Sequence, residues 1–157
     1  MSTLSSAHPA TSTPDELREI TTFRSMPLRR LLSRHGQLWS EHVSTELTSI
    51  QFGVLLCLGQ TPGGLIQTEL GAALHLDKAT VTELVRRMSR RGLVRVERDP
   101  HDGRRRIVTL TEQGERMLLR LHGPAVEVDQ MLLEPLASQE RDQLDRMLAQ
   151  VLDGEER

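Results

Sequence analysis

Aromatic side chains are the scarcest class in this chain of 157 residues, which has two phenylalanines, one tryptophan and no tyrosine. Proteins that bind single-stranded nucleic acid by stacking bases on aromatic platforms need several exposed rings, so this class is strongly disfavoured. Cysteine is also rare. Because Cys57 is the only one, no intrachain disulfide can form, which fits a reducing compartment.

Long apolar runs are also missing. The first 22 residues lack the run of about 7–15 apolar residues that marks a signal peptide, and no stretch approaches the roughly 18 that a membrane span needs. We therefore expect a cytoplasmic protein.

Patterns that would carry catalysis or hold a metal are absent as well. The sequence has no glycine-rich loop that could cradle phosphate, and its six histidines show neither a metal-ligand spacing with cysteine nor an HExxH pattern. We therefore predict that the chain is not an enzyme and holds no cofactor and no metal.

The net charge is small overall, but the charged residues are unevenly distributed. The formal net charge of −2 disfavours a globally basic nucleic-acid coat. Residues 77–106, however, hold ten basic and five acidic side chains, a net +5, whereas residues 107–157 carry −6. Nineteen of the twenty basic residues are arginine, whose planar fork suits phosphates and guanine edges. A solvated helix face is the plain alternative for such a run.

Hydrophobic periodicity predicts mostly helices. Residues 1–14 are rich in Ser, Thr, Pro and Ala without periodicity, and we predict a disordered tail over 1–22. Helices are expected at about 25–45 and at about 66–74. Between them, a capping box at Thr48 and Gln51 should start another helix that runs through Leu58.

Asp77 is a candidate N-cap for a further helix from Lys78 to about Arg91. A short helix, a tight turn and a basic helix form a helix-turn-helix pattern.

The period then changes from helical to alternating. Residues 94–98 and 106–110 alternate and are joined by turn residues, which predicts a β-hairpin. Thr111 should cap a long helix over 112–133 that Gly123-Pro124 kinks or breaks, and Ser138 should cap the last helix. The order is that of a mainly α winged helix-turn-helix with a small β-hairpin wing. We assign 48–111 to that domain and 23–47 and 112–153 to dimerisation helices.

A basic helix of this kind enters the major groove with its outward side chains at its N-terminal turns. We expect Val81, Leu84, Val85 and Met88 to face inward. The candidate DNA contacts on this helix are therefore Lys78, Thr80, Thr82, Arg86 and Arg87. Arg90 and Arg91 lie one turn further on, where phosphate or solvent is the expected neighbour.

The hairpin tip adds a second candidate contact. In Asp102-Gly103-Arg104 a carboxylate precedes an arginine by two residues, so the two can pair and fix the guanidinium. An oriented arginine on a narrow hairpin suits the negative potential of the minor groove, while Arg105 and Arg106 can reach flanking phosphates.

Four segments taken in order resemble the signature of the MarR family of bacterial transcriptional regulators. They are residues 76–88 (LDKATVTELVRRM), 91–94 (RGLV), 99–105 (DPHDGRR) and 110–114 (LTEQG). The resemblance covers about residues 25–152. It implies a homodimeric repressor on a pseudo-palindromic operator, with the helix from Lys78 in the major groove and Arg104 in the minor groove. At Gly103 the family often has Arg or Lys, and we expect Arg105 and Arg106 to supply that phosphate contact.

The terminal helices carry apolar stripes that a small winged domain does not cover, and members of the family dimerise through such helices. Folding of these helices back onto their own domain is the alternative. The stripes consist of Leu28, Leu31, Leu32, Val126, Leu132, Leu133, Leu144, Leu148 and Val151.

Family members often release DNA when a small compound binds. Arg29, His35 and Trp39 suit an aromatic acid, because a guanidinium forks onto a carboxylate, a histidine bonds a phenol and an indole forms a flat wall. The segments around them look like the subgroup that controls aromatic-acid catabolism. There are alternatives for each residue. Trp39 can belong to the core, His35 can be structural or lie at the surface, and Arg29 can pair with Asp129 or Glu127 across the dimer.

Three other functions stay open at this stage. The same fold can respond to a drug-like ligand, or to oxidation of Cys57, although its apolar surroundings and the lack of a second cysteine argue against a reactive thiol. A module that binds a partner other than DNA is the third.

Overall fold

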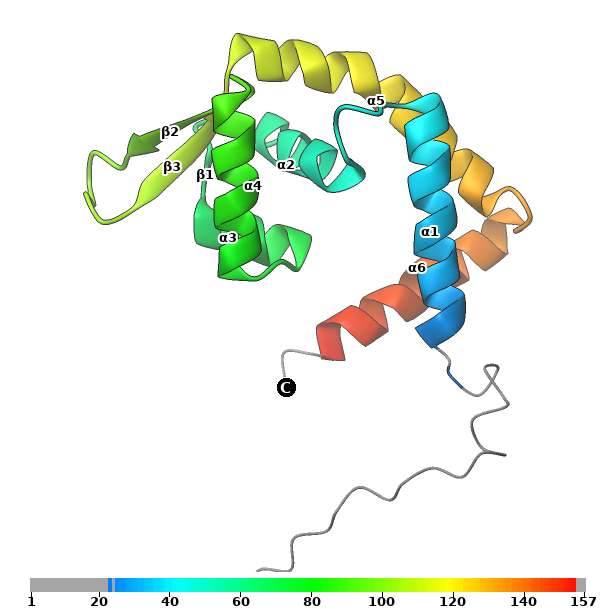
Figure 1. Cartoon of the computed structure of the whole chain (residues 1–157). Helices are drawn as coiled ribbons and strands as arrows, with labels where there is room; N and C mark the ends of the chain where they lie inside the picture. Colours follow the sequence, from blue (N-terminus) through cyan, green and yellow to red (C-terminus); the bar gives the residue numbers. More distant parts are fainter. Residues whose placement is uncertain (1–22, 24, 155–157) are drawn as a thin grey trace, which may run out of the picture. The chain divides into compact units, whose positions relative to one another are not determined.

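The computed structural model describes residue 23 and residues 25–154, so the predicted tail over 1–22 lies outside the described residues. The described residues divide into two units between Arg34 and His35, and the first helix crosses this boundary. The elements, labelled in Figure 1, are α1 (Ser25–His42), α2 (Ser49–Gly59), β1 (Leu65–Ile66), α3 (Gln67–Leu74), α4 (Lys78–Arg90), β2 (Val94–Arg98), β3 (Arg106–Leu110), α5 (Glu112–Leu133) and α6 (Ser138–Asp153).

The sheet has three antiparallel strands in the order β1-β3-β2. The predicted hairpin is confirmed, with Val94 opposite Leu110 and Arg98 opposite Arg106. β1 was not predicted, because it has only two residues and pairs Leu65 with Val108. It joins the start of α3 to the root of the wing.

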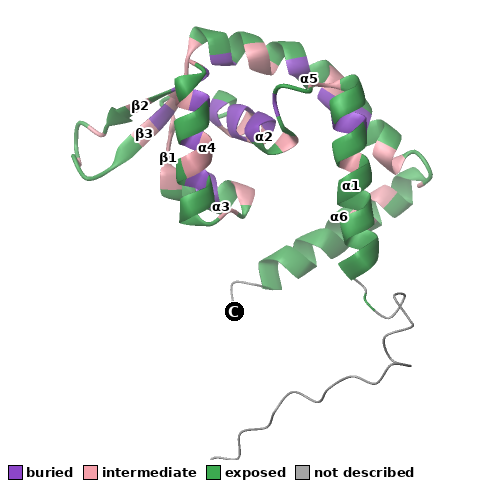
Figure 2. Ribbon diagram, viewed as in Figure 1, coloured by how far each residue is buried: buried purple, intermediate pink, exposed green. Residues whose placement is uncertain are grey.

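The core of the larger unit forms around α2. Four of its apolar side chains are buried, and α4 adds Val81, Val85 and Met88 from its inner face (Figure 2). Leu84, also expected inward, is half-buried. The apolar side chains with almost no exposed surface are Leu47, Val54, Leu55, Leu70, Val85, Met88, Leu93, Val108 and Val128.

The predicted helix caps are confirmed with one correction. Thr48 Oγ1 accepts the Gln51 N–H at 3.2 Å, and Gln51 Oε1 accepts the Thr48 N–H at 3.1 Å, which completes the capping box. Ser138 does not cap α6. The N-cap is Ala137, one residue earlier, and its side chain makes no cap hydrogen bond. Glu140 Oε2 accepts the Ala137 N–H at 2.7 Å, which is the glutamate half of a capping box.

Of the kink or break predicted at Gly123-Pro124, the break is wrong, since α5 continues through Pro124 as one helix of 22 residues. The ring removes one backbone hydrogen bond, but Leu121, Ala125 and Val128 on either side of it are buried. Burial of this face keeps the helix continuous, and Figure 1 shows it bending along its length.

Candidate nucleic-acid interface

The start of α4 is fixed by Asp77. Its Oδ1 accepts the N–H groups of Ala79 at 2.9 Å and Thr80 at 3.0 Å, and its Oδ2 accepts the Thr80 hydroxyl at 2.6 Å. These hydrogen bonds, the one from the Thr80 hydroxyl first, lower the pKa of Asp77. The predicted N-cap is confirmed, and it sets the position from which α4 presents its first turn.

We expect the cap to make stability depend on pH. Because the folded-state pKa of Asp77 lies below its ordinary value, its stabilisation is present above pH of about 4 and is lost as pH falls through the folded-state pKa. Asp77→Ala should lower Tm by about 2–4 °C at pH 7 and by much less at pH 2.5, the size usual for a lost cap. Thermal unfolding followed by circular dichroism measures both. An equal difference at the two pH values would contradict the charged cap.

The outer face of α4 carries all five of the DNA contacts predicted for this helix. Lys78, Thr80, Thr82, Arg86 and Arg87 are exposed. The Thr82 hydroxyl lies 2.8 Å from the Lys78 carbonyl oxygen and 3.3 Å from Gln67 Oε1, and the Thr80 hydroxyl donates to Asp77. Both hydroxyl protons are used within the protein, so these threonines can offer DNA an acceptor oxygen and a methyl group.

One residue of this face was missed from the sequence. Glu83 accepts hydrogen bonds from Arg86 Nε at 2.7 Å, Arg86 Nη2 at 2.6 Å and Arg87 Nε at 2.6 Å. These donors lower the pKa of Glu83 to about 2, so the carboxylate is ionised at neutral pH. The spacings i,i+3 and i,i+4 on one helix were the available signal.

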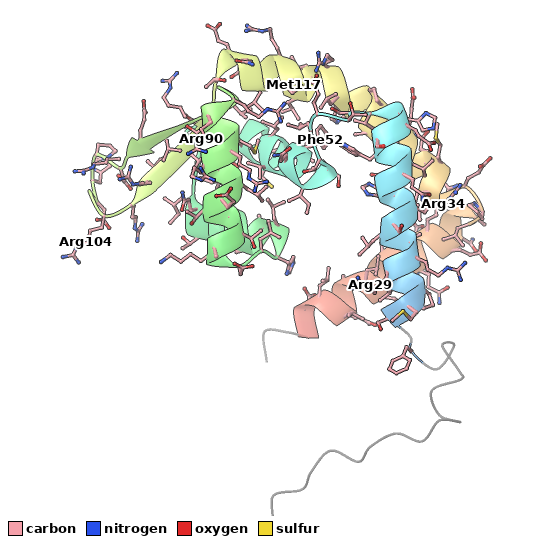
Figure 3. The ribbon with its side chains drawn as sticks, viewed as in Figure 1. Arg29, Arg34, Phe52, Arg90, Arg104 and Met117 are labelled. Atoms are coloured by element: carbon pink, nitrogen blue, oxygen red, sulfur yellow. The ribbon has the colours of Figure 1, made fainter. Side chains whose placement is uncertain are left out.

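Asp102 shapes the wing tip differently from the predicted pairing. Its Oδ1 accepts the backbone N–H of Arg104 at 3.0 Å, while its Oδ2 lies 3.3 Å from Nε of Arg105. The predicted pair with the Arg104 guanidinium is wrong, because the Arg105 N–H donates to the Asp102 carbonyl at 2.9 Å in a tight turn that brings Arg105 beside the carboxylate. The Asp102 carboxylate therefore orients the tip by binding the backbone of Arg104. Arg104 lies at the outer end of the wing (Figure 3).

The wing and α4 share one hollow. It has a volume of about 430 Å³, with apolar residues of β1, α3 and the turn after α3 on one side. Lys78 from α4 and Arg104, Arg105 and Arg106 from the wing also line it. Side chains that are far apart in sequence therefore form one basic surface.

Arg91 departs from the expectation of phosphate or solvent. Its Nη1 donates to the Glu46 carbonyl oxygen at 2.8 Å, so it ties the end of α4 to the loop between α1 and α2. Arg90 is exposed, as expected for a residue that faces solvent or phosphate.

Trp39 belongs to the core, as the alternative interpretation held. It is 6% exposed, its Nε1 donates to the Leu47 carbonyl at 2.6 Å, and its ring centroid lies 5.4 Å from that of Phe52. His35 is half-buried, with its ring centroid 6.0 Å from that of Trp39. Arg29 belongs to the other unit, and its participation with this pair stays a prediction.

A hollow of about 300 Å³ lies beside Trp39 within the larger unit. Its other lining residues are Gly36, Ser40, Ser44, Thr45, Leu47, Thr48 and Ser49. Small polar groups around one indole edge suit a small, partly polar molecule.

Cys57 is half-buried, and burial raises the pKa of its thiol. A raised pKa lowers the thiolate fraction, which disfavours the alternative of peroxide sensing through this residue.

The described residues contain neither a membrane-spanning helix nor a cluster of metal ligands. Over 23 and 25–154, no helix is long and apolar enough to cross a membrane. The same residues contain no group of three or more His, Cys, Asp or Glu placed to hold a metal ion.

Comparison with known proteins identifies the class. The model of the MarR family matches residues 45–105. The HTH-type transcriptional repressor NicR of Pseudomonas putida is 34% identical over 130 residues, which are 82% of each chain. The chain belongs to the MarR family of transcriptional regulators, and its fold is the winged helix-turn-helix of that family.

Two solved structures are similar along most of their length. The PcaV regulator of Streptomyces coelicolor, in complex with its natural ligand, has a TM-score of 0.81 and 38% identity, covering 86% of this chain and 95% of its own. BpsR of Bordetella bronchiseptica, in a structure on regulation of its DNA binding by 6-hydroxynicotinic acid, has a TM-score of 0.72 and 29% identity, covering 81% and 96%. The comparisons identify a transcriptional regulator and no enzyme.

Proposed function

We propose that this chain is a cytoplasmic, homodimeric repressor that binds a pseudo-palindromic DNA operator and releases it when a small aromatic acid binds. In this proposal residues 48–111 form the DNA-binding domain, and 23–47 and 112–153 supply the dimerisation helices. One observation carries the DNA-binding part, namely the hollow that joins Lys78 of α4 to the arginines of the wing in one basic surface.

The proposed DNA contacts extend from that surface along the outer face of α4. In this proposal Thr80, Thr82, Arg86 and Arg87, which are exposed, reach base edges and phosphates in the major groove, with Lys78 at its entry. Arg104 enters the minor groove from the wing tip, whose backbone Asp102 orients, while Arg105 and Arg106 bind flanking phosphates. NicR, named as a repressor, supports the same direction of control here.

Exposed apolar side chains support the dimer. Leu32 and Val151 are each 71% exposed on their own chain, and a second copy would remove such surface from water. Leu132, Leu133 and Leu144 of the predicted stripes are half-buried. The exposed members of the stripes are Leu28, Leu31, Leu32, Val126, Leu148 and Val151. Light scattering at micromolar concentration should give the mass of two chains, and a monomer mass would contradict the dimer.

The effector proposal is supported by two structural relatives. PcaV was solved with its natural ligand, and BpsR is regulated by 6-hydroxynicotinic acid. We propose that Arg29 binds the carboxylate of a related acid, with His35 bonding a ring substituent and Trp39 forming part of the wall. The hollow beside Trp39 offers space of the right order for a single aromatic ring, although of the three proposed ligand contacts only Trp39 lines it.

The test of the regulator is selection of DNA by the protein. Duplexes enriched from a randomised pool should contain an inverted repeat and bind far more tightly than scrambled duplexes, at least about 10³-fold. Hydroxybenzoates and hydroxynicotinates are then added to the complex. Release by one of these acids supports the effector proposal. Enrichment without an inverted repeat contradicts the dimeric operator, and no enrichment contradicts DNA recognition.

Calorimetry measures effector binding in the absence of DNA. The wild-type protein should bind at least one of these acids, and Arg29→Ala should weaken that binding by about tenfold or more, the loss expected for a charge-assisted hydrogen bond. Arg34→Ala removes a neighbouring guanidinium of the same helix and is the matched control. Equal binding by the wild type and Arg29→Ala would contradict the role of Arg29.

A further inference from the structure

We propose that Glu83 sets how strongly α4 distinguishes its target DNA from other DNA, by holding Arg86 and Arg87 and offsetting part of their charge. The inference rests on the proposed DNA contacts of α4. It makes Glu83 a positioning residue, because it acts through two arginines.

The contacts make one carboxylate the partner of two guanidinium groups. Glu83 takes the Nε and Nη2 edge of Arg86 as a two-bond fork and adds the Nε of Arg87. Each arginine keeps further N–H groups that Glu83 does not use, since a guanidinium has five. The remaining groups of Arg86 are therefore offered in a restricted set of directions, as recognition of a guanine edge requires.

The location of these three side chains separates them from an ordinary surface pair. They lie on the face of α4 that carries the predicted contacts, and between 40% and 64% of each side chain is exposed. An exposed pair at i,i+4 adds little to folding stability wherever it lies. Glu112 and Arg116, 3.5 Å apart on α5, make such a pair away from this face.

The charge of Glu83 should act mainly on non-target DNA. Nonspecific affinity comes from cations that displace counterions from phosphates, so it rises with the charge that a surface presents. With Glu83 ionised, the cluster of Glu83, Arg86 and Arg87 presents one net positive charge in place of two. A phosphate also competes with Glu83 for the same N–H groups. Both effects weaken binding to arbitrary sequences, whereas a target that fits the oriented guanidinium is less affected.

The experiment compares Glu83→Gln with wild type on two duplexes, one that the wild-type protein selects from a randomised pool and a scrambled duplex of the same composition. Glutamine keeps the size and helix preference of glutamate and removes its charge. Glu112→Gln makes the same change in an exposed helical pair on α5 and is the matched control. Circular dichroism checks that both variants keep their helical content.

We expect Glu83→Gln to bind the scrambled duplex about 3- to 10-fold more tightly and to make the salt slope steeper by up to about one unit. The ratio of selected to scrambled affinity should fall by at least about threefold, and Glu112→Gln should leave it unchanged. A ratio that Glu83→Gln does not lower, or that Glu112→Gln lowers equally, overturns the inference.

A third variant distinguishes failure of this inference from failure of the proposed function. Arg86→Ala should weaken binding to the selected duplex. If the wild type selects a duplex but Arg86→Ala binds it equally well, the inference about Glu83 is overturned while the regulator stands. If the wild type selects no duplex, the proposed function fails and the inference with it.

Discussion

Replacing Gly64 with alanine is expected to lower the free energy of unfolding by about 2–4 kcal/mol. Gly64 has φ +86°, a left-handed conformation that side chains with a Cβ rarely adopt. A Cβ there would also overlap the carbonyl oxygen of Val108 and press on the side chains of Thr109 and Ile107. The first cost is about 1 kcal/mol and the overlap adds about 1–3 kcal/mol, because the obstacle is backbone in the central strand of the sheet.

Gly63 is the matched control for this prediction. Its φ is +95°, but a Cβ added there meets nothing within 4 Å. Gly63→Ala should therefore cost only the conformational part, about 1 kcal/mol. Urea denaturation of both variants measures the difference. If both variants lose the same free energy of unfolding, the close approach of Gly64 to β3 is not what holds β1 against the wing.

Arg104→Ala is expected to weaken binding to the selected duplex by at least about tenfold. One good arginine contact is worth about 1–3 kcal/mol, and the proposed dimer would lose it from both wings. We expect this effect because Arg104 lies at the outer end of the wing, on a backbone that Asp102 holds. The loss should be larger on the selected than on the scrambled duplex if the arginine enters a narrow minor groove.

Arg116→Ala is the control for the loss of one positive charge. Arg116 is exposed on α5, and its Nη1 lies 3.5 Å from Glu112. It should change affinity for the selected duplex by less than about twofold, which is a small effect of a remote exposed charge. Fluorescence anisotropy at one fixed salt concentration compares both variants. An equal loss from both would mean that net charge, and no contact of Arg104, carries the effect.

Local signals in the sequence predicted most of the fold. Caps such as Thr48 and Asp77 fixed helix starts, because the groups that satisfy a helix terminus lie within a few residues. Changes of hydrophobic period located the wing for the same reason. Ser138 failed as a cap because α6 begins one residue earlier than predicted, with Ala137 at the N-cap and its N–H bonded to Glu140. Pro124 failed as a helix breaker because buried neighbours outweigh the hydrogen bond that it removes.

What the sequence could not supply depended on contacts through space. β1 is too short to leave a periodic signal and exists because the Gly63-Gly64 turn brings it to β3. The hollow shared by Lys78 and the wing arginines joins residues about 26 positions apart. The partner of Asp102 depended on how the tip turns, and a spacing of two residues did not reveal it. Residue type predicted the candidate contacts, and geometry assigned their partners.

Hydrogen exchange with and without the selected duplex tests most directly whether α4 and the wing form the DNA-binding surface. Peptides covering 78–87 and 99–106 should exchange more slowly when the duplex saturates the protein, because bound DNA covers and orders these segments. Peptides of α6 should exchange at the same rate in both states. Slower exchange in α6, with no change over 78–87 and 99–106, would contradict the proposed interface.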